Sequence, residues 1–180
     1  MMPSVKRSRF EAELAKDLQS LHIQALSNAI ATLGALACPS LLFALDACYE
    51  RARNLLDMCE RRNGSSLIHI NVLQAYILLG LYESRRPDFA LAWITIGRAL
   101  RLGQIMCLDK GQPQSFTEGH VGVFTPLPPT FDPTEIEERH RTLWHLYILD
   151  GLASMRTCSA PALDRRQVSQ NNRHHHAAIV

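Results

Sequence analysis

The sequence predicts an all-α fold, arranged as an irregular multi-helix bundle. Apolar residues recur every three or four positions in one segment after another, and no segment of useful length alternates apolar with polar residues. The 180 residues are 47% apolar and 20% charged, which is typical of a globular domain that can bury a core. We therefore expect a helical domain that needs no disulfide or metal to fold.

The first helix is expected over residues 9–37, with a bend near Gly34. It ends before Pro39, because the residue that precedes a proline is pushed out of helical geometry. Ser40 can cap a second helix, whose apolar stripe comprises Leu41, Leu45, Cys48, Ala52, Leu55 and Cys59. The charged residues fall mostly outside this stripe and predict a solvated face: Glu50, Arg51, Arg53, Asp57, Glu60 and Arg61.

A third helix is expected from a cap at Ser66 to about Tyr82. Its apolar residues wrap nearly all round, which is typical of a helix at the centre of a bundle. Pro87 and Asp88 restart the chain, and one face of a fourth helix is expected to comprise Phe89, Trp93, Ile96, Leu100 and Gly103. Slim side chains beside that face would let a neighbouring helix approach closely: Ala92, Ile96, Ala99 and Gly103.

Glycine and proline accumulate over residues 109–131, which predicts a long surface loop. Asp132 is then the expected N-cap of a fifth helix, with Pro133 at its first position and Glu135 three residues after the cap. Glu137 precedes Arg141 by four residues, which is the spacing of an ion pair on one helix face.

Two uncharged segments, residues 18–45 and 63–82, are long enough to span a membrane. Each carries several polar side chains, which lipid would leave unsatisfied, so buried helices of a soluble domain are expected instead. The amino terminus has acidic residues where an export signal needs its apolar core. Unevenly spaced cysteines predict free thiols in a reducing compartment: Cys38, Cys48, Cys59, Cys107 and Cys158.

Three segments, in this order, resemble the fungal-specific transcription factor domain, the regulatory middle region of binuclear zinc-cluster transcription factors. The first is Tyr49-Glu50-Arg51-Ala52-Arg53-Asn54-Leu55-Leu56-Asp57, which is followed by the apolar helix from Val72 to Glu83. The second is Ala92-Trp93-Ile94-Thr95-Ile96-Gly97-Arg98-Ala99-Leu100-Arg101-Leu102-Gly103-Gln104. The third runs from Glu137 to Asp150 and carries an acidic, arginine and aromatic signature.

The resemblance implies an all-helical regulatory domain of a nuclear transcription factor, which modulates an attached DNA-binding module through protein or small-molecule contacts. It also implies structural roles for a set of signature residues: Glu138, Arg139, Arg141, Trp144, Tyr147, Asp150, Arg98 and Arg101. The charged members would dock against the helix that carries Arg98 and Arg101, and the aromatic rings would lie in the core. The regulatory domain would extend over residues 1–168, with the best match over residues 49–168.

The chain departs from this family in two respects. It lacks the six-cysteine cluster that binds two zinc ions, so we expect no zinc cofactor and no sequence-specific DNA binding by this chain. We expect the chain to be truncated after Val168, before the helices that complete the family's domain, which a fragment, a truncated paralogue or a misjudged gene end would each explain; residues 169–180 are expected to form a disordered tail. If helices are missing there, uncovered apolar faces of the third and fifth helices predict low solubility or a homodimer.

Two other classes of function are weighed against this hypothesis. The sequence contains no His-paired cysteine, glycine-rich phosphate loop or serine elbow, so no catalytic residue and no enzymatic activity are expected. The run His174-His175-His176 is not expected to form a specific metal site, because no second ligand cluster accompanies it. A generic helical-repeat scaffold for protein interaction is the alternative, and regularly stacked helix pairs would favour it.

Overall fold

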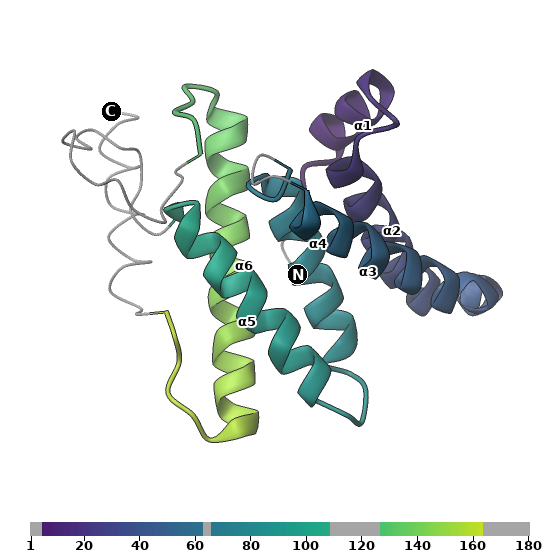
Figure 1. Cartoon of the computed structure of the whole chain (residues 1–180), viewed down its shortest axis with the longest axis vertical. Helices are drawn as coiled ribbons and strands as arrows, with labels where there is room; N and C mark the ends of the chain where they lie inside the picture. The colour runs from purple at the N-terminus through teal and green to yellow at the C-terminus, as the bar shows by residue number, and fades with distance from the viewer. Residues whose placement is uncertain (1–4, 63–65, 109–126, 164–180) are drawn as a thin grey trace. The chain divides into compact units, whose positions relative to one another are not determined.

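The computed structural model describes residues 5–62, 66–108 and 127–163, and within these ranges it contains helices and no strand (Figure 1). The helices are α1 (Arg7–Lys16), α2 (Leu21–Ala37), the 3-10 helix η1 (Pro39–Ala44), α3 (Leu45–Arg61), α4 (Ile70–Glu83), α5 (Ala90–Ile105) and α6 (Pro133–Thr157). The all-α prediction is confirmed. The α-helices that the structure describes range in length from 10 to 25 residues.

The chain forms two compact units. Among the described residues, the N-terminal unit extends to Ala99 and the C-terminal unit begins at Leu100. Helix α5 begins in the first unit and ends in the second.

The chain between α1 and α2 is not helical, which corrects the expectation of one helix over residues 9–37. The Asp17 carboxylate accepts a hydrogen bond from the backbone N–H of Gln19 at 3.1 Å. The side-chain amide of Gln24 donates to the carbonyl oxygen of Leu18 at 2.9 Å. Such local bonds compete with helical ones for the backbone, and here they accompany the break.

The start of the second predicted helix differs from the expectation. Helix α2 ends at Ala37 as predicted, but Pro39 opens η1, and α3 begins only at Leu45. Ser40 therefore caps no α-helix, and Leu41 is 46% exposed instead of packed in the stripe. The remaining stripe packs as predicted over Ala52, Leu55 and Cys59, which are buried.

Helix α4 is the most buried helix of the N-terminal unit, as its apolar pattern predicts. Eleven of its 14 residues are buried, including the polar residues Asn71, Gln74 and Glu83. Helix α2 packs against both α3 and α4. The predicted start at Ser66 is wrong, because α4 begins at Ile70 and its cap is His69, whose ring nitrogen Nδ1 accepts from the N–H of Asn71 at 3.2 Å.

Helix α5 approaches α4 closely, as its slim side chains predict. A Cβ atom placed on Gly80 would lie 3.1 Å from Cγ1 of Ile96. The aromatic part of the prediction is wrong, since Trp93 is 42% exposed. Ile96 and Leu100 of the predicted face are buried as expected, and Ala92 is buried beside them.

The predicted start of the fifth helix is confirmed at the residue level. The Asp132 carboxylate accepts from the N–H of Thr134 at 2.9 Å, and Pro133 is the first helical residue of α6. The helix ends at Thr157, and the next residue, Cys158, has a left-handed φ of 54°. The chain then turns back beside α6, and the N–H of Leu163 donates to Oδ2 of Asp150 at 2.8 Å (Figure 1).

One face of α6 is exposed although it is apolar. Its large side chains are Trp144, Ile148, Leu152 and Met155, which are 37%, 52%, 42% and 72% exposed. The expectation of an uncovered face is confirmed for this helix and is wrong for α4, which is mostly buried.

Most of the predicted loop at 109–131, the tail at 169–180 and the histidine run lie outside the described residues. Within the described part of the chain, every helix is too short or too polar to cross a membrane.

Candidate functional site

A buried polar network joins α3, α4 and α5 within the N-terminal unit. Its centre is Glu83, whose side chain is fully buried. The Tyr49 hydroxyl donates to Oε1 of Glu83 at 2.9 Å, and Nη1 of Arg53 lies 3.5 Å from the same oxygen. Arg53 also donates to Oγ1 of Thr95 at 2.9 Å, so one guanidinium links three helices.

A second set of contacts extends the network along α3. The Tyr76 hydroxyl of α4 donates to the carboxylate of Glu60. Nη1 of Arg98 lies 3.6 Å from Glu60 and 3.8 Å from Asp57. The Arg98 side chain is 40% exposed, and ion pairs at that exposure contribute little to stability. The contacts of Arg98 with Glu60 and Asp57 therefore orient α5 and add little stability. The contacts of Glu83 are shielded from water.

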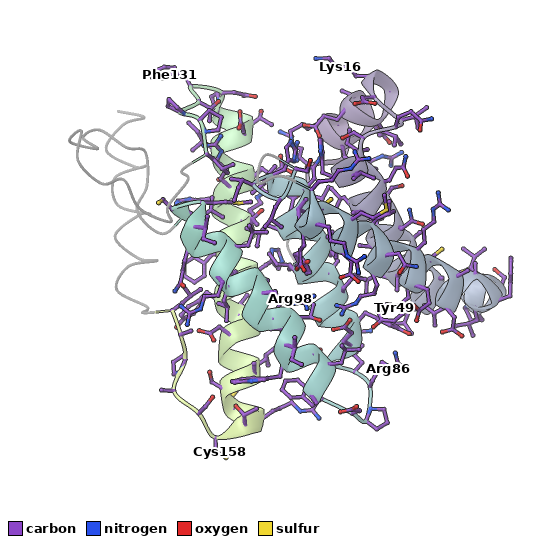
Figure 2. The ribbon with its side chains drawn as sticks, in the orientation of Figure 1. Lys16, Tyr49, Arg86, Arg98, Phe131 and Cys158 are labelled. Atoms are coloured by element: carbon purple, nitrogen blue, oxygen red, sulfur yellow. The ribbon has the colours of Figure 1, made fainter. Side chains whose placement is uncertain are left out.

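The two tyrosines of the network hold their protons strongly. Burial raises the pKa of Tyr49 above its ordinary value, and the neighbouring Glu83 carboxylate raises it further. Burial and the hydrogen bond to Glu60 raise the pKa of Tyr76 in the same way. The positive charge of Arg86 lowers the pKa of Tyr49 in turn, because its guanidinium carbon lies 5.8 Å from the centre of the ring (Figure 2). Both hydroxyls are thus hydrogen-bond donors at neutral pH.

This chemistry suits a structural role. A phenol whose pKa is raised is a poor base and a poor nucleophile at neutral pH. Within the described residues, no group of three or more His, Cys, Asp or Glu side chains is arranged to hold a metal ion. The network instead fixes the relative positions of three helices through directional contacts.

The signature residues of the third segment have partners on α6 and in the chain that flanks it. Asp150 is buried and accepts from the N–H of Leu163, and Glu138 is buried as well. Arg141 donates to Oε1 of Glu137 at 2.8 Å, which confirms the predicted i, i+4 pair. Arg139 donates to Glu135 at 2.5 Å and to the carbonyl oxygen of Pro128 at 2.8 Å.

The structure also describes the contacts of the remaining signature residues. Trp144 and Tyr147 pack edge to face with their ring centres 5.7 Å apart, but Trp144 is 37% exposed, so its placement in the core was wrong. Arg101 donates to Gln104 at 3.0 Å, and Arg98 belongs to the network described above. Docking of the charged α6 residues against the helix of Arg98 and Arg101 stays a prediction.

The sequence reasoning missed the centre of the network. It assigned Arg53 to a solvated face, yet the Arg53 side chain is 18% exposed and contacts Glu83. The usable signal was the four-residue spacing of Tyr49, Arg53 and Asp57 on one helix face. A glutamate at the end of an otherwise apolar helix also indicates a buried partner of opposite charge.

The fold and the network define an all-helical domain whose three central helices are joined by buried polar contacts. The chain matches the family model of the fungal specific transcription factor domain over residues 3–171, and it belongs to that family. The segments that carry the likeness, 49–57, 72–83 and 92–104, contain seven residues of the network: Tyr49, Arg53, Asp57, Tyr76, Glu83, Thr95 and Arg98.

Relatives of the chain include fungal transcription activators. It is 32% identical to the depudecin biosynthesis cluster-specific transcription activator of Alternaria brassicicola over 161 residues, which is 86% of this chain and 24% of the relative. The corresponding protein of Fusarium langsethiae is 32% identical over 156 residues, 86% of this chain and 25% of the relative.

The pigment biosynthesis transcriptional activator of Monascus ruber is 37% identical over 117 residues, 62% of this chain and 20% of the relative. The chain therefore spans about a quarter of the length of the first two relatives. No solved structure matches the chain significantly.

Proposed function

We propose that this chain is a regulatory domain of a fungal, pathway-specific transcription factor. The family match over residues 3–171 carries the proposal, and the relatives, whose names describe transcription activators of biosynthetic pathways, support it. The domain acts in the nucleus and modulates transcription through protein or small-molecule contacts, without catalysis. The buried network supports a structural rather than a chemical role, because its tyrosines are protonated donors at neutral pH.

In this proposal the chain does not read DNA itself. Its formal charge of +2 and the six-cysteine cluster missing from its sequence support this part. The test is a fluorescence titration of the purified chain with labelled duplexes from promoters of biosynthetic genes, compared with a scrambled duplex. We expect equal, weak, salt-sensitive binding to both. Nanomolar binding to one promoter sequence over the scrambled duplex would overturn it.

We also propose that the exposed face of α6 contacts a second copy of the chain. Trp144, Ile148, Leu152 and Met155 follow one another at spacings of four, four and three residues, so they form one continuous row along the helix. At the amino-terminal end of this row, Glu137 and Arg141 neutralise each other. A second copy with the same row would therefore meet an apolar surface without an unpaired charge, which is self-complementary as in a two-fold symmetric interface.

Sedimentation of the whole chain tests this contact. The wild type is expected to associate reversibly in the micromolar range, and Ile148→Glu and Met155→Glu are expected to sediment as monomers at the same concentrations. Met58→Glu is the matched control, because Met58 is also exposed but lies on α3. A monomeric wild type, or association that both α6 variants retain, would contradict a dimer through this face.

A further inference from the structure

Helix α1 is attached to the N-terminal unit by polar contacts. None of its ten residues is buried, and a helix of this length is marginal in isolation. Its residue Arg9 donates from Nη2 to Oδ1 of Asn71 at 3.0 Å. Asn71 in turn donates from Nδ2 to Oε2 of Glu13 at 2.8 Å, and Asn71 is fully buried at the start of α4. One buried amide thus holds two charged side chains of α1.

Two histidines lie beside this amide. Nδ1 of His69 accepts from the backbone N–H of Asn71 at 3.2 Å and caps α4. This contact requires a lone pair on Nδ1, which only the neutral ring with its proton on Nε2 offers. The ring of His22, from α2, stacks on the ring of His69 with centroids 3.8 Å apart and an interplanar angle of 21°.

Charged groups of α1 face the two rings. Arg9 opposes a positive charge on His22, while Glu13 and Asp17 favour it. Glu13 also faces His69, and its own pKa is lowered although burial would raise it, because the hydrogen bond from Asn71 and the charge of Arg9 stabilise the carboxylate; a positive charge on His69 adds to this. Ser20 completes the surroundings, with its hydroxyl 2.9 Å from Nδ1 of His22.

We propose that the stacked pair of His22 and His69 is a pH-sensitive device that releases α1 from α4 when the pH falls below neutrality. Protonation of Nδ1 removes the acceptor that caps α4 and leaves the backbone N–H of Asn71 facing a second N–H donor. A second proton, on His22, places two positive rings in contact next to Arg9. Both changes disturb the backbone position of Asn71, which is the residue that holds Arg9 and Glu13.

The direction of the effect follows from the linkage between protonation and folding. Burial lowers the pKa of His22 below its ordinary value, so the unfolded chain binds the proton more readily than the folded chain. This contribution to stability is complete above the ordinary histidine pKa of about 6.5. It is lost as the pH falls from there through the lower pKa of the folded state.

The test measures hydrogen-exchange protection factors in the whole chain at about pH 7.5 and about pH 5.5, on either side of the ordinary histidine pKa. Protection of residues 11–16 in α1, relative to the amides of α3 as an internal reference, is expected to fall about fivefold at the lower pH, which is the effect of losing one helix cap. His69→Asn keeps a side-chain acceptor at the cap and does not titrate. His22→Phe keeps a flat ring and does not titrate.

The double variant H22F/H69N is expected to show the same α1 protection at both pH values. His145→Gln is the control, since His145 lies on α6 and its Nδ1 contacts the carbonyl oxygen of Arg141; this variant should keep the wild-type response. Equal α1 protection at both pH values in the wild type would overturn the proposal. A fivefold fall that persists in the double variant would also overturn it.

Discussion

At the scale of single residues, Glu83 has the largest expected effect on stability. Its carboxylate is fully buried, accepts from Tyr49 and lies 3.5 Å from the guanidinium of Arg53. Removing one partner from a buried charged contact leaves the other without compensation, which costs more than the contact itself contributes.

Glu83→Ala is therefore expected to lower the free energy of unfolding by about 2–4 kcal/mol. Urea unfolding followed by circular dichroism measures this change. Glu50→Ala is the matched control, because Glu50 is an exposed acid on α3, and its removal is expected to cost at most about 0.5 kcal/mol. Equal effects of the two substitutions would show that the network does not stabilise the unit.

The tyrosines of the network provide a prediction about alkaline pH. Burial and a neighbouring carboxylate raise the pKa of Tyr49 and of Tyr76, so the folded chain holds these protons more tightly than the unfolded chain does. Their contribution to stability is complete below the ordinary tyrosine pKa of about 10 and is lost as the pH rises beyond it.

Absorbance of phenolate near 295 nm follows this titration. The wild type is expected to develop part of its phenolate signal only above about pH 11, together with unfolding. Tyr49→Phe and Tyr76→Phe should each reduce the phenolate absorbance that develops above about pH 11. Neither variant should change the absorbance that develops near the ordinary tyrosine pKa. If both variants instead lose signal near pH 10, the environments described for these rings are wrong.

At the scale of helices, the close contact of α4 with α5 predicts different effects of alanine at two glycines that are otherwise alike. Gly80 and Gly97 both lie inside helices, where alanine is favoured over glycine by about 1 kcal/mol. A Cβ on Gly80 would meet Ile96 at 3.1 Å, whereas a Cβ on Gly97 meets nothing within 4 Å.

Gly97→Ala is thus expected to raise the free energy of unfolding by up to about 1 kcal/mol. Gly80→Ala should gain less than this or destabilise the chain, because the buried Ile96 side chain must shift. Thermal unfolding of the two variants side by side measures the difference. A gain at Gly80 equal to that at Gly97 would mean that the helices are not in tight contact there.

Helix boundaries were predictable where local chemistry determines them. Asp132 and Pro133 mark the start of α6 in the sequence and in the structure, since an N-cap is a contact between neighbours. The break after α1 lacks glycine and proline, and it involves a bond from Gln24 back to the carbonyl of Leu18, six residues away. That pairing has no signature in a single sequence.

The centre of the polar network was hidden from the sequence for a related reason. Tyr49 and Glu83 are 34 residues apart, and Arg53 and Thr95 are 42 apart. Periodicity identified α4 as a central helix and α3 as amphipathic, but it gives no information on how one helix is rotated against another. From the sequence alone, an arginine beside an apolar stripe is therefore predicted to face solvent, because the carboxylate that it contacts is not known.

At the scale of the whole chain, the family relationship supports the proposal that this chain is a regulatory domain acting on an attached DNA-binding module. The measurement that tests this most directly is a reporter assay in a fungal host, with the chain fused to an unrelated DNA-binding module of known site. The fusion is expected to change expression several-fold relative to the module alone, and the chain without the module is expected to leave expression unchanged.

The Glu83→Ala fusion, in which the network is broken, should lose the effect, and the Glu50→Ala fusion should retain it. A wild-type fusion that matches the module alone, at equal protein level, would contradict the account.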